Sequence, residues 1–166
     1  MRWTLWTVGY GRWPAARRAE ALVDELRELG VTRLVDVRLA PCASSLTVGH
    51  PYGPKPWNLQ GKGQGIVELS SSGGIVYEWL VELGNPQRQD PSQAILKEQI
   101  ADPGGGWPVH RGLERLAGRV REPGAVVAIL CACPKAADCH RSTIAEALRE
   151  RHFAGELGIR EVGERD

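Results

Sequence analysis

The sequence has almost no net charge and no long apolar segment. Its 21 basic and 20 acidic side chains leave a formal charge of +1, so the molecule as a whole has no field that would attract nucleic acid or a membrane surface. The longest uninterrupted apolar run covers the nine residues 125–133, whereas a membrane-spanning helix needs about 20. We therefore expect no membrane partner. A local basic patch that binds nucleic acid is the alternative that the net charge does not exclude.

A secretion signal and a disulfide framework are also lacking. Residues 1–10 contain one Arg and a mixture of Trp, Thr and Leu, without the apolar core or small-residue cleavage site of a signal peptide. We expect a cytoplasmic protein. Only four cysteines occur, and Cys131, Cys133 and Cys139 lie within nine residues of one another. This clustering predicts a local thiol, metal or reactive site instead of a disulfide scaffold.

The size and composition are those of one globular domain. The 166 residues are 42% apolar and 25% charged, which is typical of a soluble chain that buries a core and unlike a disordered or coiled-coil protein. We expect a single domain over residues 1–166, and no internal repeat is visible in the sequence.

Segments typical of strands alternate with segments typical of helices. The expected strands cover 4–8, 31–37, 74–77, 125–131 and 158–162, and the expected helices cover 14–29, 66–69, 91–100, 113–121 and 142–153. This alternation predicts a single three-layer α/β domain with a mainly parallel central sheet, Rossmann-like in class. The apolar run at 125–131 is expected to be an interior strand, buried on both faces.

Residues 41–65 have the composition of a long loop. They contain four prolines and five glycines and show neither a helical nor a strand period. Loops of this length inside a compact domain are often functional. We interpret this one as a candidate substrate-binding flap, with a disordered insertion as the alternative.

The strongest chemical signal follows the most apolar strand. Ligand sites in parallel sheets lie beyond the carboxyl ends of the strands, and here that region reads Cys131-x-Cys133-x5-Cys139-His140-Arg141. A thiol at the start of a helix has a lowered pKa, and a neighbouring His and Arg lower it further. Cys139 is thus a candidate nucleophile, His140 a candidate proton shuttle and Arg141 a candidate anion ligand. The alternative is that the cysteines pack as small buried side chains.

Zinc is a second interpretation of the same segment. Three cysteines and a histidine are suitable ligand types. The spacing argues against the metal, because adjacent residues such as Cys139 and His140 rarely converge on one tetrahedral ion. We also expect Cys131 and Cys133 to point to opposite sides if both belong to the strand. We therefore place thiol chemistry first and assign no metal, and leave zinc as the alternative.

Glycines after the first expected strand partly imitate a dinucleotide-binding fingerprint. Gly9 and Gly11 have the required spacing, but Pro14 stands where the third glycine belongs. A plain glycine turn is the preferred interpretation, with nicotinamide or flavin binding as the alternative. The cofactor is left unassigned.

Asp36 and Arg38 lie at the end of the second expected strand and are expected to point to the same side. They form either a structural ion pair or a general base beside an anion ligand. Tyr10 and Tyr77 are more typical of packing residues whose hydroxyl groups are hydrogen-bonded than of acids.

Several blocks of sequence together resemble a known family. They are Thr7-Val8-Gly9-Tyr10-Gly11-Arg12, Leu34-Val35-Asp36-Val37-Arg38 with Pro41 and Ser44, Gly74-Ile75-x-Tyr77, Leu83-Gly84, and Leu130-Cys131 leading to Cys139-His140-Arg141. This pattern resembles the domain of unknown function 488 family, a small bacterial and archaeal α/β domain without an agreed reaction. The resemblance implies that Arg12, Asp36, Arg38, Ser44, Tyr77, Cys131, Cys139, His140 and Arg141 form one site. The chain departs from the family pattern at Cys133, where relatives commonly carry an acidic residue.

These observations predict a small enzyme that acts on an anionic substrate, phosphorylated or nucleotide-like. The predicted catalytic residues are Cys139, His140 and Asp36, and the predicted substrate-binding residues are Arg12, Arg38, Ser44, Tyr77 and Arg141. The alternative is a non-catalytic module that binds nucleotide or nucleic acid, in which the arginines bind phosphate and the cysteines are structural.

Overall fold

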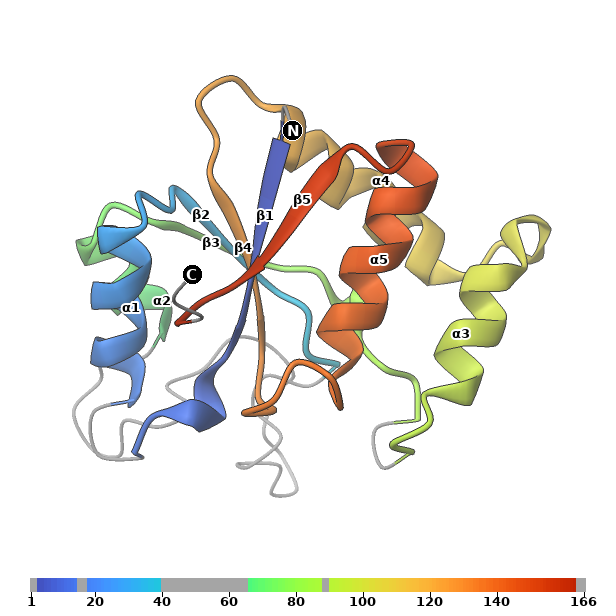
Figure 1. Cartoon of the computed structure of the whole chain (residues 1–166), viewed down its shortest axis with the longest axis horizontal. Helices are drawn as coiled ribbons and strands as arrows, with labels where there is room; N and C mark the ends of the chain where they lie inside the picture. The colour runs from blue at the N-terminus through green and yellow to red at the C-terminus, as the bar shows by residue number, and fades with distance from the viewer. Residues whose placement is uncertain (1–2, 15–17, 40–65, 88–89, 164–166) are drawn as a thin grey trace.

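The computed structural model describes residues 3–14, 18–39, 66–87 and 90–163. Five strands form one parallel sheet in the order β3-β2-β4-β1-β5 (Figure 1). The strands are β1 (Trp3–Gly9), β2 (Arg33–Asp36), β3 (Val76–Trp79), β4 (Val127–Cys131) and β5 (Leu157–Glu161). The predicted α/β class with a parallel sheet is confirmed.

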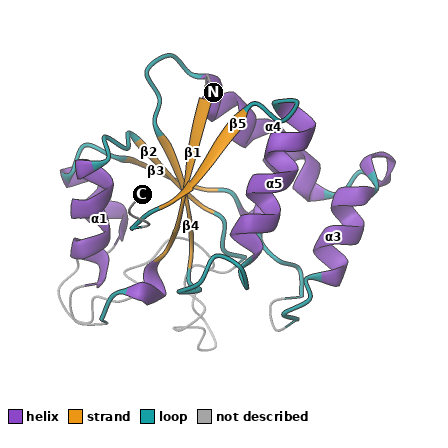
Figure 2. Ribbon diagram, in the orientation of Figure 1, coloured by secondary structure: helices purple, strands orange, loops and turns teal. Residues whose placement is uncertain are grey.

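Helices cover both faces of the sheet and make three layers (Figure 2). They are α1 (Arg18–Glu28), α2 (Ile66–Ser72), α3 (Ala94–Ala101), α4 (Pro108–Arg121) and α5 (His140–His152). One apolar core forms between α1, α2 and one face of the sheet, and a second forms between α4, α5 and the other face. Cys131 and Cys139 belong to the second core. No helix in the described ranges is long and apolar enough to cross a bilayer.

Strand β4 occupies the centre of the sheet, as the sequence predicted. All five of its residues are buried, and Val127 pairs with Leu5 of β1 on one side and with Arg33 of β2 on the other. After β1 and β2 the chain continues into α1 and α2 on one face, whereas after β4 it continues into α5 on the opposite face. Such a reversal opens a ligand-binding crevice at the carboxyl ends of the strands. The cysteine-rich segment therefore begins at the position where sites form in this class of fold.

Two helices begin earlier than the sequence predicted. Helix α4 starts at Pro108, five residues before Leu113, and passes through Gly112. Gly112 resembles a helix breaker in the sequence, but here it allows close packing, since an added Cβ atom would lie 2.7 Å from a methyl carbon of Leu83. Helix α5 starts at His140 instead of Ser142. The predicted loop at 41–65 lies outside the described residues.

Candidate functional site

The glycine turn after β1 lets the loop that follows β4 cross the end of the first strand. Gly11 donates a backbone hydrogen bond of 3.0 Å to the carbonyl oxygen of Ala132, and an added Cβ atom on Gly11 would lie 2.6 Å from that oxygen. Gly9 packs still more closely against the carbonyl group of Cys133. Both glycines thus serve the packing of the cysteine segment, which agrees with the plain-turn interpretation.

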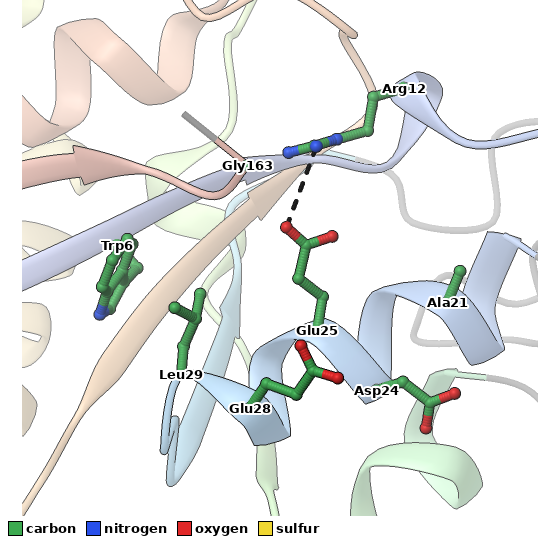
Figure 3. Close-up of a pocket in the computed structure, with 8 residues that line it drawn as sticks. All are labelled: Trp6, Arg12, Ala21, Asp24, Glu25, Glu28, Leu29 and Gly163. Carbon is green, nitrogen blue, oxygen red and sulfur yellow. Dashed lines mark ion pairs between the residues drawn. The ribbon is translucent and has the colours of Figure 1, made fainter. Parts of the chain in front are cut away.

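Arg12 points into a pocket between α1 and the ends of β1 and β5 (Figure 3). The pocket has a volume of about 480 Å³ and is lined by Trp6, Glu25 and Glu28 among others. The guanidinium group donates to the carbonyl oxygen of Val162 and lies 3.9 Å from a carboxylate oxygen of Glu25. The structure therefore directs this predicted anion ligand toward acidic neighbours.

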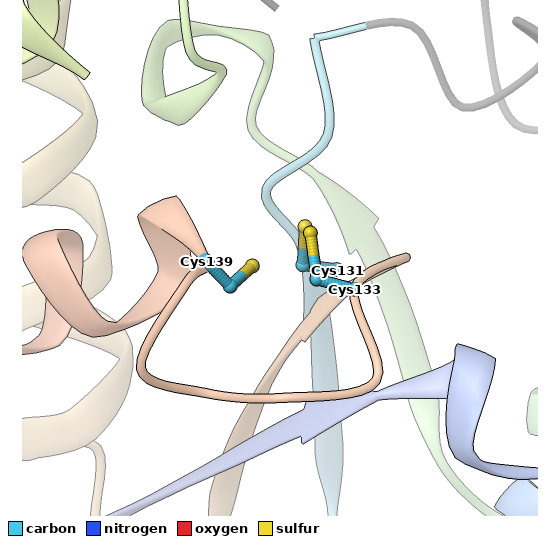
Figure 4. A group of neighbouring side chains, drawn as sticks. All are labelled: Cys131, Cys133 and Cys139. Atoms are coloured by element: carbon cyan, nitrogen blue, oxygen red, sulfur yellow. The ribbon is translucent and has the colours of Figure 1, made fainter. Parts of the chain in front are cut away.

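Three thiols converge at the carboxyl end of β4. Cys131 ends the strand, Cys133 lies two residues beyond it, and Cys139 caps the N-terminus of α5. Their sulfur atoms all lie within 4.8 Å of one another, with the Cys139 sulfur turned across the loop toward the other two (Figure 4). Cys131 and Cys139 are buried, Cys133 is partly exposed, and all three are free. We call Cys131, Cys133, Cys139 and His140 the cysteine cluster.

The loop between the cysteines is held by its own hydrogen bonds. The backbone N–H of Cys139 and the hydroxyl group of Ser142 both donate to the carbonyl oxygen of Ala136, at 3.0 and 2.6 Å. The carbonyl oxygen of Cys133 accepts a hydrogen bond of 2.8 Å from Arg141. These contacts hold the backbone on both sides of the thiols in place.

His140 connects the cysteine cluster to the neighbouring strand. Its Nε2 atom lies 2.7 Å from the carbonyl oxygen of Val37. A carbonyl oxygen only accepts, so Nε2 carries a proton and the other ring nitrogen is left for the thiols. That nitrogen, Nδ1, lies 3.5 Å from the Cys131 sulfur and 4.0 Å from the Cys139 sulfur.

The thiols of the cysteine cluster differ in acidity. A hydrogen bond from Cys131 lowers the pKa of Cys139 to about 3 against the effect of burial, and His140 and the backbone N–H of Arg141 lower it further. Hydrogen bonding to Cys133 and Cys139, together with burial, raises the pKa of Cys131. Burial lowers the pKa of His140, but the Cys139 thiolate and the Val37 carbonyl raise it by more. These shifts favour a thiolate at Cys139 and the protonated form of His140 beside it.

Asp36, Arg38 and Tyr77 form a second buried group. The Asp36 carboxylate is fully buried, and Nη2 of Arg38 lies 2.6 Å from one of its oxygens. The hydroxyl group of Tyr77 donates to the same carboxylate at 2.6 Å. Burial and the negative charge of Asp36 raise the pKa of Tyr77 well above its usual value. Of the two interpretations of Asp36 and Arg38, the geometry matches the ion pair.

Arg141 is the most deeply buried of the predicted anion ligands. It is fully shielded from solvent, and besides Cys133 it binds the Glu161 carboxylate at 2.7 Å. Glu161 also accepts a hydrogen bond from the hydroxyl group of Thr7. Neither Cys133 nor Glu161 was among the predicted site residues. The expectation that Cys131 and Cys133 point to opposite sides is wrong, because residues two apart share one side of a strand and their sulfur atoms lie within 4.8 Å of each other. This spacing was the available signal for Cys133.

The predicted site residues are thus spread along the carboxyl edge of the sheet. Asp36, Arg38 and Tyr77 gather at the ends of β2 and β3, and Cys139 and His140 lie beside the end of β4. The guanidinium groups of Arg12 and Arg141 contact the end of β5. Ser44 and Cys42 lie outside the described residues.

Comparison with known proteins gives no match, whether with family models, curated proteins or solved structures. The resemblance to the domain of unknown function 488 family stays a prediction. The chemistry of the site has to follow from its own geometry.

Proposed function

We propose that the protein is a small enzyme that acts on an anionic substrate, phosphorylated or nucleotide-like, with the Cys139 thiolate as nucleophile. One observation carries this proposal. Cys139 caps the N-terminus of α5, where Cys131 and His140 face its sulfur and lower its pKa to about 3. Nucleophilic cysteines are activated in this way, by a helix N-terminus and an adjacent histidine.

The proposed reaction uses two residues. The Cys139 sulfur forms a bond to an electrophilic centre of the substrate, and the bond to the leaving group breaks with its electron pair. The His140 imidazolium, at 4.0 Å from this sulfur, gives its proton to the leaving group. Water then breaks the bond to sulfur. One proton of the water returns to His140 and the hydroxyl group stays with the product, which restores the thiolate and the imidazolium.

The positive charge for an anionic substrate comes from α5 and His140. The N-terminus of a helix carries free N–H groups and a partial positive charge. The predicted arginine ligands have acidic neighbours instead, because Arg38 binds Asp36, Arg141 binds Glu161 and Arg12 lies beside Glu25. A non-catalytic phosphate-binding module needs arginines that face solvent. The pairing of these three groups therefore favours the enzyme.

The test begins with a thermal-shift screen of chelator-treated protein against nucleotides and sugar phosphates. A compound that binds only the folded state raises the melting temperature. We expect such a compound to be turned over by the wild type and by His152→Gln, at the far end of α5, whereas Cys139→Ser binds it and leaves it unchanged. Turnover by Cys139→Ser at the wild-type rate would refute the proposal.

A further inference from the structure

The geometry points to a zinc site formed by the sulfur atoms of Cys131, Cys133 and Cys139 and by Nδ1 of His140. The three sulfurs come from separate parts of one short segment and meet within 4.8 Å. Thiolate and imidazole are the ligands of structural zinc sites of the three-cysteine, one-histidine type. A metal at this position does not require the protein to be an enzyme.

The spacing of the three sulfur atoms from one another, and of His140 Nδ1 from two of them, is close to that around a tetrahedral ion. With Zn–S bonds of about 2.3 Å and a Zn–N bond of about 2.0 Å, tetrahedral geometry separates two sulfurs by about 3.8 Å and a sulfur from a nitrogen by about 3.5 Å. His140 Nδ1 lies 3.5 Å from the Cys131 sulfur and 4.0 Å from the Cys139 sulfur. The three sulfur atoms, which lie within 4.8 Å of one another, need to approach one another by about 1 Å, and rotation of the cysteine side chains provides such a shift.

The orientation of His140 supports the role of ligand. Histidines that bind a metal usually donate their other ring N–H to a carbonyl or carboxylate oxygen, which fixes the tautomer and aims the lone pair. Here Nε2 meets the carbonyl oxygen of Val37 at 2.7 Å and Nδ1 faces the sulfurs. The sequence argument that Cys139 and His140 rarely bind one ion is therefore outweighed by a ring that is already turned toward the sulfur atoms.

Arg141 supplies a second, independent indication. Its Nε atom is buried and has no hydrogen-bond partner among the described residues, although Nη1 and Nη2 are bonded to Cys133 and Glu161. A buried guanidinium N–H without an acceptor is costly. Three thiolates around one Zn²⁺ leave a net charge of −1 on sulfur atoms that accept hydrogen bonds. Such a centre suits the unpaired Nε donor of Arg141.

Zinc explains more of the arrangement than a disulfide does. A disulfide joins two sulfurs and leaves the third thiol and the histidine without a role, whereas a tetrahedral ion uses all four groups. A bound ion also takes the Cys139 sulfur as a ligand. The zinc-loaded protein therefore holds the proposed nucleophile in a masked form, and removal of the metal frees it.

The first test uses the wild-type chain. Metal-free, reduced protein is titrated with Zn²⁺ in competition with a chromophoric chelator and, separately, with Co²⁺. We expect one ion per chain, and for cobalt the sulfur-to-metal charge-transfer and d–d bands of a tetrahedral thiolate site. Zinc is expected to protect Cys131, Cys133 and Cys139 from alkylation. Octahedral cobalt spectra, or alkylation of these three cysteines at the same rate with and without zinc, would overturn the site.

Variants then assign the ligands. We expect Cys133→Ser and Cys139→Ser each to weaken zinc binding by more than about 100-fold, because loss of an outer partner alone costs about 10- to 100-fold. His140→Gln should weaken it by at least about 10-fold, whereas His152→Gln, at the far end of the same helix, should bind as the wild type does. Circular dichroism checks that each variant folds. Wild-type affinity in His140→Gln would overturn the four-ligand site.

The metal site and the proposed reaction fail separately in these experiments. If the protein does not bind zinc but the chelator-treated protein turns over substrate, the zinc site is refuted and the proposed reaction stands. If the wild type gives a cobalt thiolate spectrum but Cys139→Ser turns over substrate at the wild-type rate, the role of Cys139 as nucleophile is refuted and the metal site stands.

Discussion

The backbone of Gly9 and the carbonyl group of Cys133 pack so closely that no side chain fits between them. A Cβ atom on Gly9 would lie well inside van der Waals contact with this carbonyl oxygen and 2.7 Å from Nη1 of Arg141. The same oxygen accepts the hydrogen bond from Arg141. The end of β1 therefore sets the position of Cys133 in the cysteine cluster.

Gly9→Ala should destabilise the protein and disturb the cysteine cluster. The added methyl group must push Cys133 and Arg141 away, and overpacking of this kind typically costs about 1–3 kcal/mol. Urea unfolding, monitored by circular dichroism, measures the loss in the free energy of unfolding. The matched control is Gly118→Ala in the exposed part of α4, where nothing lies within 4 Å of the added Cβ atom. The free energy of unfolding of this variant should rise by about 0.5–1 kcal/mol, because alanine is favoured over glycine inside a helix. Equal stabilities of Gly9→Ala and the wild type would contradict the packing.

The alkylation rate of Cys139 should depend little on pH between about 5 and 8. Its pKa of about 3 keeps it ionised over this range, whereas the raised pKa of Cys131 makes its thiolate fraction fall about tenfold for each unit of decreasing pH. Mass-spectrometric mapping of iodoacetamide labelling in chelator-treated protein measures both profiles. The comparison uses slopes and not absolute rates, because Cys139 is only 1% exposed. A Cys139 profile as steep as that of the unfolded protein would show that its pKa is not lowered.

Removal of the Glu161 carboxylate should lower the free energy of unfolding more than most single substitutions do. Glu161→Ala leaves the fully buried Arg141 guanidinium without its counter-charge, and breaking a buried pair in this way costs about 3–5 kcal/mol. Glu150→Ala, which removes one of the two acidic partners of Arg149 on the exposed side of α5, should lower the free energy of unfolding by less than about 0.5 kcal/mol. Chemical denaturation of both variants provides the measurement. A similar loss in the two would mean that Glu161 does not hold Arg141.

Glu78 should contribute stability that disappears in acid. Burial raises its pKa, but hydrogen bonds and charges from Arg119, Arg33 and Arg115 lower it by more, so that it lies below the usual value. A carboxylate with a lowered pKa in the folded state stabilises the protein above its unfolded pKa of about 4.3, and this contribution is lost as the pH falls through the folded pKa.

Glu78→Gln tests this linkage. The variant should be less stable than the wild type by about 1–2 kcal/mol at pH 7, and the difference should shrink steadily below about pH 4.3. Unfolding curves at several pH values measure it, with Glu146→Gln, on the exposed side of α5 beside Arg149, as the control for a surface pair. A difference that stays constant down to pH 3 would exclude the carboxylate charge as its source.

The sheet and the location of the site follow from local sequence patterns. The apolar run at 125–131 predicts a strand buried on both faces because only a central parallel strand tolerates such a composition, and β4 is that strand. The helical spacing of apolar residues begins just after Cys139, and it therefore predicts that Cys139 lies at the start of a helix. Since strand ends in this class of fold carry the ligand site, the cysteine segment could be selected without the structure.

The partners of the arginines could not be predicted in the same way. Arg141 meets Glu161 because β5 lies at the edge of the sheet beside β1, and Arg12 turns toward Val162 for the same reason. Strand order at the edge is not encoded in any local pattern. The convergence of Cys133 with Cys139 depends likewise on the path of the loop over Gly9 and Gly11, which no spacing rule describes.

The central position of β4 has a consequence for synthesis of the chain. Strand β1 pairs with β4 and β5, so its neighbours in the sheet emerge from the ribosome only after residue 126 has done so. Until then β2 and β3 of the nascent chain can pair with each other, whereas β1 is an apolar segment whose native neighbours in the sheet are absent. Pairings this distant along the chain close large loops and are slow to form. The cysteine cluster, which needs Val37 of the early segment and Cys131 of the late one, is assembled in the same step that closes the sheet.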